Sequence, residues 1–117
     1  MSIDTIQKGK KGETLAISYL TKNGHTIHAC NYRFHRGEID IIAQKQQTLL
    51  FIEVKVRSNL LFGYPETFVT PKQEESYHQA ATHYIETHQW EGPIRFDIIA
   101  ITPMKNEWTI THLKDAF

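Results

Sequence analysis

Cysteine is nearly absent from this 117-residue chain, whose single cysteine is Cys30. One cysteine excludes an internal disulfide framework and is typical of proteins in a reducing compartment. Long apolar runs are absent too. No segment approaches the ~20 apolar residues of a membrane-spanning helix, and residues 1–14 lack the apolar stretch of a signal peptide. We therefore expect a cytoplasmic protein with no membrane partner.

Net charge is also lacking, because 13 Lys and Arg balance 13 Asp and Glu. This excludes a uniformly basic surface for nucleic acid, but the charge is unevenly distributed. Residues 1–36 contain six Lys or Arg against two Asp or Glu, a net +4, which leaves −4 for the remainder. A basic N-terminal third can contact phosphates, although lysines on a solvated helix face give the same pattern.

The chain contains no linker, no internal repeat and no low-complexity segment. A chain of this length buries roughly two-thirds of its unfolded surface, which is enough for one core. We predict a single domain spanning residues 1–117.

Two apolar segments, GEIDII at residues 37–42 and FIEVKVR at 51–57, contain charges that a buried strand rarely has. Side chains alternate along a strand. One face of the second segment should therefore hold Leu49, Phe51, Glu53, Lys55 and Arg57, and the other Leu50, Ile52, Val54 and Val56. In the first segment the two faces should hold Glu38, Asp40 and Ile42 against Ile39, Ile41 and Ala43. The polar turn QKQQT between the segments predicts an antiparallel hairpin that brings Asp40 close to Glu53 and Lys55.

Two carboxylates that face one point repel each other unless a proton or a cation lies between them. Hard oxygen ligands suit Mg²⁺ or Mn²⁺. A metal held by Asp40 and Glu53 can polarise a phosphodiester and activate water, and Lys55 can orient that water or neutralise charge on the phosphate. A structural salt bridge between Glu53 and Lys55 is the alternative.

Turn and cap residues set the rest of the layout. We predict a first helix over residues 9–23, with an apolar stripe and Gly24 as C-terminal cap, and strands over 26–32, 37–43 and 48–57. A second helix begins at Thr70 as N-cap, followed by Pro71 and by Gln73 of a capping box. Its packing face should hold Tyr77, Ala80, Ala81, Tyr84, Ile85 and His88. RFDIIAI and residues 107–113 should form two further strands, the last at an edge.

Other polar residues have competing interpretations. Glu13 borders the packing face of the first helix, where it can reach the water shell of a metal or simply interact with the helix dipole. Lys72 begins the second helix, whose N-terminus can hold a phosphate. Asp97 is explained by pairing with Arg95 on the same strand face. His25, His28 and Cys30 lack a fourth ligand, so zinc is not favoured. Phe62, Tyr64 and Phe68 can stack on bases or cover the edge of the core.

The pattern GxxD followed by ExK resembles the nuclease core of the PD-(D/E)xK superfamily, whose restriction-endonuclease-like fold is shared by archaeal Holliday-junction resolvases. Over nearly the whole chain, the sequence is similar to the YraN-like family of predicted bacterial endonucleases. The segments that carry this similarity are KGETLAISYLTKNG, NYRFHRGEIDIIA, FIEVKVR, FGYPETFVTPKQ, RFDIIAI and HLKDAF. Ile39 stands where the superfamily's name has proline.

The resemblance implies an α/β fold, with a central mixed sheet flanked by helices. It implies that Asp40 and Glu53 bind Mg²⁺ or Mn²⁺, that Lys55 is the catalytic lysine and that Glu13 is the glutamate of the first helix. We expect a metal-dependent endonuclease acting on DNA, with branched or structured DNA as substrate and a homodimer as an assembly that would fit two-strand cleavage. A nucleic-acid-binding scaffold without turnover and an RNA substrate remain alternatives. The residues expected to contact nucleic acid are Lys10, Lys11, Arg33, Arg36, Arg57 and Lys72.

Overall fold

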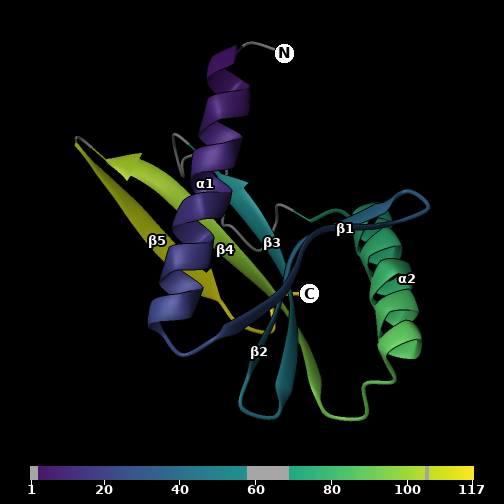
Figure 1. Ribbon diagram of the computed structural model, residues 1–117. Coiled ribbons are helices and arrows are strands. Elements are labelled where there is room, and N and C mark those ends of the chain that lie inside the picture. Colours follow the sequence, from purple (N-terminus) through teal and green to yellow (C-terminus); the bar gives the residue numbers. More distant parts are fainter. Residues whose placement is uncertain (1–2, 58–68, 105) are drawn as a thin grey trace.

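The computed structural model of the protein describes residues 3–57, 69–104 and 106–117, which form two helices and one five-stranded sheet (Figure 1). The elements are α1 (Ile3–Lys22), β1 (Thr26–Phe34), β2 (Gly37–Lys45), β3 (Thr48–Val56), α2 (Pro71–His88), β4 (Ile94–Met104) and β5 (Glu107–Leu113). The strands lie in the order β1-β2-β3-β4-β5. Among the described strands, only β3 and β4 pair in parallel, and the chain between them contains α2. This mixed α+β architecture confirms the predicted fold class and is consistent with a restriction-endonuclease-like core.

The two helices cover opposite faces of the sheet (Figure 1). On the α1 side, Ala16 and Leu20 pack against a fully buried layer that comprises Ile41, Ala43, Leu50, Ile52, Ile99 and Ile101. On the α2 side, Tyr77, Ala80, Ala81 and Tyr84 pack against Ile39, Ile42, Leu49 and Phe51. Each fully buried large apolar side chain contributes about 1.5–3 kcal/mol by leaving water. The central strands are thus buried on both faces, which makes any charged residue within them conspicuous.

Strict alternation holds along β3 and fails once along β2. Leu49 and Phe51 face α2 while Leu50, Ile52, Val54 and Val56 face α1, as predicted. In β2, Ile41 and Ala43 face α1, but Ile39 packs with Ile42 on the α2 side. The prediction that Ile39 shares a face with Ile41 is therefore wrong. The break lies at Asp40, immediately beyond the last β2–β3 pair, Ile41 with Ile52.

Two glycines permit the close packing of the helices on the sheet. A Cβ atom at Gly12 would overlap a methyl group of Val56, so α1 approaches β3 through this position. A Cβ atom at Gly37 would overlap the carbonyl oxygen of Ser76, so the start of β2 lies directly against the backbone of α2. Only glycine fits either position without displacing its neighbour.

The helix termini follow the predicted caps, with one difference in length. Gly24 adopts the left-handed conformation (φ +83°), and the N–H of His25 donates to the Leu20 carbonyl, which ends α1 as predicted. The first helix starts at Ile3, six residues earlier than predicted. The capping box of Thr70 and Gln73 begins α2 as predicted, whereas His88 of its predicted packing face is exposed. Neither described helix is long and apolar enough to span a membrane.

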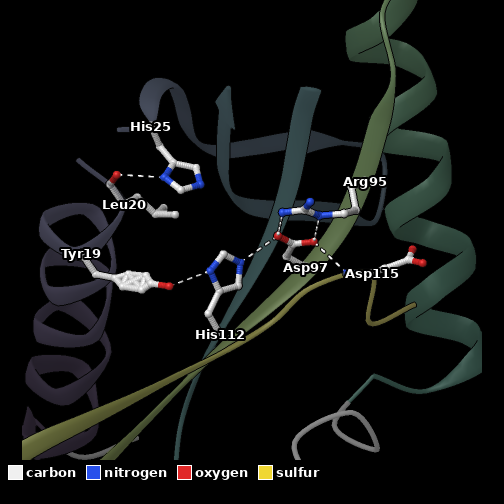
Figure 2. A network of polar contacts seen from close by, with 7 residues as sticks. All are labelled: Tyr19, Leu20, His25, Arg95, Asp97, His112 and Asp115. Carbon is white, nitrogen blue, oxygen red and sulfur yellow. Dashed lines mark hydrogen bonds and ion pairs between the residues drawn. The ribbon is translucent and has the colours of Figure 1, made fainter. Parts of the chain in front are cut away.

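A buried polar network joins α1, β4, β5 and the C-terminal residues (Figure 2). Asp97 is fully buried and accepts two hydrogen bonds from the Arg95 guanidinium, at 2.8 and 2.9 Å. The structure thus confirms the predicted Arg95 pairing. It adds a hydrogen bond from His112 Nε2 (2.8 Å) and one from the backbone N–H of Asp115 (3.0 Å). His112 Nδ1 contacts the Tyr19 hydroxyl at 2.9 Å, which ties α1 to the far edge of the sheet.

Candidate active site

Asp40, Glu53 and Lys55 lie together where β2 and β3 separate. Beyond the pair Ile41–Ile52, the Asp40 carboxylate replaces a main-chain partner and accepts the N–H of Val54 at 2.8 Å. This holds Asp40 beside Glu53, the residue it would pair with if the register continued. Lys55 Nζ lies 3.3 Å from Glu53 Oε1, and these two side chains are only 15% and 14% exposed. The predicted hairpin therefore brings the three predicted residues to one place.

Among the described residues, only one nearby cation, the Lys55 ammonium, offsets the charges of the two carboxyl groups, so both ionise less readily than isolated carboxyls. Burial raises the pKa of Asp40, although hydrogen bonds from the Val54 N–H and from Glu53 oppose this shift. Burial and the negative charge of Asp40 raise the pKa of Glu53 to about 8, and the Lys55 ammonium only partly offsets them. Two buried carboxyl groups placed this way favour a shared proton or a bound cation between them.

A cavity of about 390 Å³ opens beside this pair, between the sheet and the beginning of α2. Its lining residues carry charges of both signs. Strands β2 and β3 contribute the carboxylates of Glu38, Asp40 and Glu53, the turn before β2 contributes Arg36, and α2 contributes Lys72. The remaining lining residues are Gly37, Gln73, Ser76 and Tyr77. The positive end of the α2 dipole adds to Lys72, so the α2 side of the cavity attracts anions.

Glu13 approaches the site from α1. Burial and the negative charges of Asp40 and Glu38 raise the pKa of Glu13. With its side-chain nitrogen turned toward the carboxylates, Asn31 donates hydrogen bonds to Glu13 Oε1 (2.9 Å) and Glu38 Oε1 (3.2 Å). Asn31 thus links the first helix to β2.

Asn31 was not among the predicted site residues. The pairs on either side, Cys30 with Ile41 and Tyr32 with Ile39, place it opposite Asp40 in the β1–β2 ladder. Its backbone is left-handed (φ 54°), a conformation that asparagine tolerates better than most residues. A short amide residue inside a predicted strand is the only sequence signal that points to this role.

The donor set suits a hard divalent cation. In the described part of the chain, no three His, Cys, Asp or Glu side chains form a complete metal-binding group. Mg²⁺, however, commonly keeps several waters and binds proteins through one or two carboxylates together with substrate phosphates. Asp40 and Glu53 supply two such carboxylates, close together and with an excess of negative charge.

The predicted nucleic-acid-binding residues divide into two groups. Arg36 and Lys72 line the cavity, so the structure brings them to the carboxylate pair. Lys10 lines a separate cavity of about 280 Å³ with Glu13, and Lys11 Nζ lies 5.6 Å from the centre of the Trp108 ring. The other predicted contacts, Arg33 and Arg57, interact with Glu38 (3.4 Å) and with the Val56 carbonyl (3.0 Å), respectively.

Other candidate positions have different surroundings. A larger cavity, about 580 Å³, lies on the outer face of α2. Glu74, Glu75 and Glu86 line it, and none of its described lining residues is Lys or Arg, so its charge has the wrong sign for a polyanion. His25 Nδ1 contacts the Leu20 carbonyl and His28 Nε2 contacts Gln44, so neither ring is directed to Cys30 by these contacts. Phe62, Tyr64 and Phe68, the predicted stacking residues, lie outside the described residues.

Comparison with known proteins identifies the family. The sequence profile of the uncharacterised protein family UPF0102 matches residues 12–101. The chain belongs to the UPF0102 family. A UPF0102 protein of Christiangramia forsetii is 46% identical over 109 residues, which cover 93% of this chain and 92% of the relative. A UPF0102 protein of Cytophaga hutchinsonii is 42% identical over 113 residues, covering 97% of each chain. The matched residues 12–101 include Glu13, Asp40, Glu53, Lys55 and Lys72, but not Lys10 and Lys11.

Proposed function

We propose that this UPF0102 protein is a metal-dependent endonuclease that hydrolyses DNA phosphodiester bonds and that it belongs to the PD-(D/E)xK superfamily. The observation that carries this proposal is the position of Asp40 and Glu53 beside one cavity that Lys72 and Arg36 also line, with Lys55 Nζ 3.3 Å from Glu53 Oε1. Asp40 and Glu53 can hold a cation, and the cavity beside them also contains Lys72, which attracts phosphate. A phosphodiester in this cavity would contact both the cation and Lys72.

A divalent ion held by Asp40 and Glu53 would polarise the phosphodiester and lower the pKa of an attacking water. Lys55 supplies a positive charge from the same strand, where it neutralises charge that develops on the phosphate. Lys72 and the N-terminus of α2 bind and orient the phosphate on the other wall. Glu13, held through Asn31, adds negative charge on the α1 side of the site.

Substrate and setting follow from the size of the molecule. The chain has only 117 residues, so after the core is built little remains to form a base-reading element. We therefore favour branched or structured DNA, of the kind that recombination and repair produce. Cleavage of both strands needs two sites, which a homodimer would supply. We place the protein in the cytoplasm, where an exposed free thiol such as that of Cys30 stays reduced.

Cleavage of a panel of substrates tests the proposal. Linear, nicked, flapped and four-way DNA and a matched RNA are incubated with Mg²⁺, Mn²⁺ or EDTA. We expect cleavage of at least one DNA with metal and none with EDTA. Lys55→Ala should reduce the rate by about 10²–10³, because a group that stabilises charge in the transition state is removed. Lys45→Ala removes an exposed lysine and serves as the matched control.

Two outcomes would contradict the proposal. One is the absence of cleavage under every metal condition while the protein still binds DNA in Ca²⁺, which would indicate a binding protein without turnover. The other is a Lys55→Ala variant that cleaves as fast as the parent, which would leave Lys55 as the structural partner of Glu53. Preferential cleavage of the RNA would replace the substrate class.

A further inference from the structure

Asn31 contacts two carboxylates with one side-chain nitrogen. Turned toward them, this nitrogen donates hydrogen bonds to Glu13 Oε1 at 2.9 Å and to Glu38 Oε1 at 3.2 Å. The carbonyl oxygen of Asn31 in the same place would face two acceptor oxygens, so the partners determine the orientation of the amide. An amide nitrogen has two hydrogens and no charge, and it therefore serves both acceptors without neutralising either. Asn31 thus holds together two like charges, one on α1 and one on β2.

The backbone of Asn31 is irregular at the level of the candidate metal ligands. Asn31 lies opposite Asp40 and has a left-handed conformation (φ 54°), which residues other than Gly, Asn and Asp rarely adopt. On the neighbouring strand, Asp40 ends the β2–β3 pairing and accepts the N–H of Val54. Backbone conformations of this kind persist where the surrounding structure holds them, and they cluster at functional sites.

Asn31 also joins the surroundings of two cavities. It lines the cavity of about 280 Å³ together with Glu13, whereas its other partner, Glu38, lines the cavity of about 390 Å³ together with Asp40 and Glu53. Burial and the charges of Asp40 and Glu38 raise the pKa of Glu13, and the hydrogen bond from Asn31 opposes this shift. The contact with Asn31 therefore favours the charged form of Glu13, which attracts cations.

We infer that Asn31 is a positioning residue: its carboxamide holds the Glu13 and Glu38 carboxylates beside the candidate metal ligands, where they strengthen the binding of a divalent cation. Groups that surround the direct ligands of a metal typically change its affinity 10–100-fold. A neutral amide suits this role better than Lys or Arg, because a cationic side chain would cancel the charge that attracts the metal. The inference rests on the proposed function for the cation, but it requires neither a substrate nor cleavage.

Asn31→Gly tests this inference because it removes the carboxamide and keeps a backbone conformation that glycine adopts readily. We expect its affinity for Mn²⁺, measured by isothermal titration, to fall roughly 10-fold. Gln46→Gly is the matched control, since Gln46 is an exposed amide residue with nearly the same φ (53°) in the turn between β2 and β3. The control should bind Mn²⁺ as the parent does. Circular dichroism and urea unfolding report whether both variants are folded.

A double-mutant cycle with Glu13→Gln separates positioning from a general structural role. Glu13 is the partner to change, because Arg33 already lies 3.4 Å from Glu38 Oε2 and offsets part of the Glu38 charge. If Asn31 acts through Glu13, Asn31→Gly should weaken Mn²⁺ binding much less in the Glu13→Gln background than in the parent. A distortion of β1 would instead weaken binding equally in both backgrounds.

Paramagnetic broadening by Mn²⁺ gives a second readout. Substoichiometric Mn²⁺ should broaden the ¹³C resonances of the Asp40 and Glu13 carboxyl groups in the parent. At equal Mn²⁺ occupancy, the Glu13 resonance should broaden less in Asn31→Gly. If Asn31→Gly does not fold, the parent's spectrum decides: broadening of both resonances supports the inference, and a Glu13 resonance that stays sharp while that of Asp40 broadens overturns it.

The remaining outcomes distinguish this inference from the nuclease activity. A folded Asn31→Gly protein with the parent's Mn²⁺ affinity overturns the inference, as do equal effects in the two backgrounds, and the proposed function then stands if the parent cleaves DNA. A parent that binds no Mn²⁺ also overturns it. Weaker Mn²⁺ binding by Asn31→Gly that depends on Glu13 supports the inference even if the parent cleaves nothing, in which case only the proposed function fails.

Discussion

At the scale of single residues, the sheet contains carboxylates with opposite surroundings. Asp97 is fully buried and satisfied by Arg95, His112 and the Asp115 N–H. Asp40 and Glu53 lie side by side with one ammonium next to them and a cavity beside them. Their pKa values accordingly shift in opposite directions: that of Asp97 falls, while those of Asp40 and Glu53 rise. Asp97 is fully hydrogen-bonded and therefore has a structural role. Asp40 and Glu53 have fewer compensating cations, so they can bind a ligand.

Asp97 should make the protein sensitive to acid. Burial tends to raise the pKa of this carboxyl, but hydrogen bonds from His112, Arg95 and the Asp115 N–H outweigh it and lower the pKa to about 2. Because the folded pKa is below the unfolded one, the network stabilises fully above about pH 4, and this contribution, about 2 kcal/mol, is lost as the pH falls toward 2. Urea unfolding measures the free energy of unfolding of the parent and of Asp97→Asn. The difference between the two should shrink as the pH falls from about 4 to about 2.

Asp115→Asn, which neutralises an exposed carboxylate next to the same network, serves as the control and should follow the parent. A gap between the parent and Asp97→Asn that stays constant from about pH 6 to about pH 2 would contradict the assignment. Should Asp97→Asn not fold, a ¹³C NMR titration of the parent's Asp97 carboxyl replaces it, and a midpoint near the ordinary value of about 3.9 would carry the same contradiction.

At the scale of elements, close contact between α1 and β3 brings Glu13 to the site. Gly12 makes this contact against Val56. Gly12→Ala should destabilise the parent by about 1–3 kcal/mol through overpacking. In a Val56→Ala background, where the methyl group is gone, the same change should cost little or stabilise, because alanine favours a helix interior by about 1 kcal/mol over glycine. A double-mutant cycle of urea unfolding measures this coupling, and additive effects of the two changes would refute the contact.

The periodicity of the sequence predicted the order of elements and the hairpin that unites Asp40 with Glu53. Both could be predicted because strand alternation, the polar turn and the capping box each depend only on a few neighbouring residues. The face of Ile39 was not predictable in this way. Alternation assumes a continuous ladder, but the Asp40 side chain takes the N–H of Val54 and ends the β2–β3 pairing there.

Features that depend on distant contacts were missed for a related reason. The first helix was predicted to start at residue 9, whereas α1 begins at Ile3, continues through Gly9, and uses Gly12 for packing on β3. Tyr77 has the spacing of a core residue, which it is, and nothing in the sequence indicates that its hydroxyl lacks a partner. The residues of the candidate site could be predicted from the motif, but their supporting contacts required the fold.

At the scale of the whole molecule, a protein of zero net charge must hold a polyanion through local charge. We expect weak DNA binding without metal and stronger binding with Ca²⁺, which reduces the negative charge of the carboxylate pair. If Lys10 and Lys11 bind phosphates, changing both to Gln should make the slope of log affinity against log salt shallower by about 0.9 for each duplex-DNA phosphate that is no longer neutralised. Fluorescence anisotropy at several salt concentrations measures this slope.

The control for this double variant is Lys45→Gln with Lys114→Gln, which removes the same charge from two other exposed lysines. It should lower the affinity only slightly and leave the slope unchanged. If both double variants keep the parent's slope, Lys10 and Lys11 belong to a solvated surface, and the path of the DNA follows Arg36 and Lys72 instead.

Binding of Mn²⁺ tests the central claim, that Asp40 and Glu53 jointly hold a divalent cation, independently of any substrate. Isothermal titration of the parent should show a site whose affinity falls at least about tenfold in both Asp40→Asn and Glu53→Gln, because each removes a charged ligand. Circular dichroism should show that both variants stay folded, and Glu91→Gln, an exposed carboxylate away from the cavity, should bind as the parent does. Folded Asp40→Asn and Glu53→Gln proteins that bind Mn²⁺ with the parent's affinity would contradict the account.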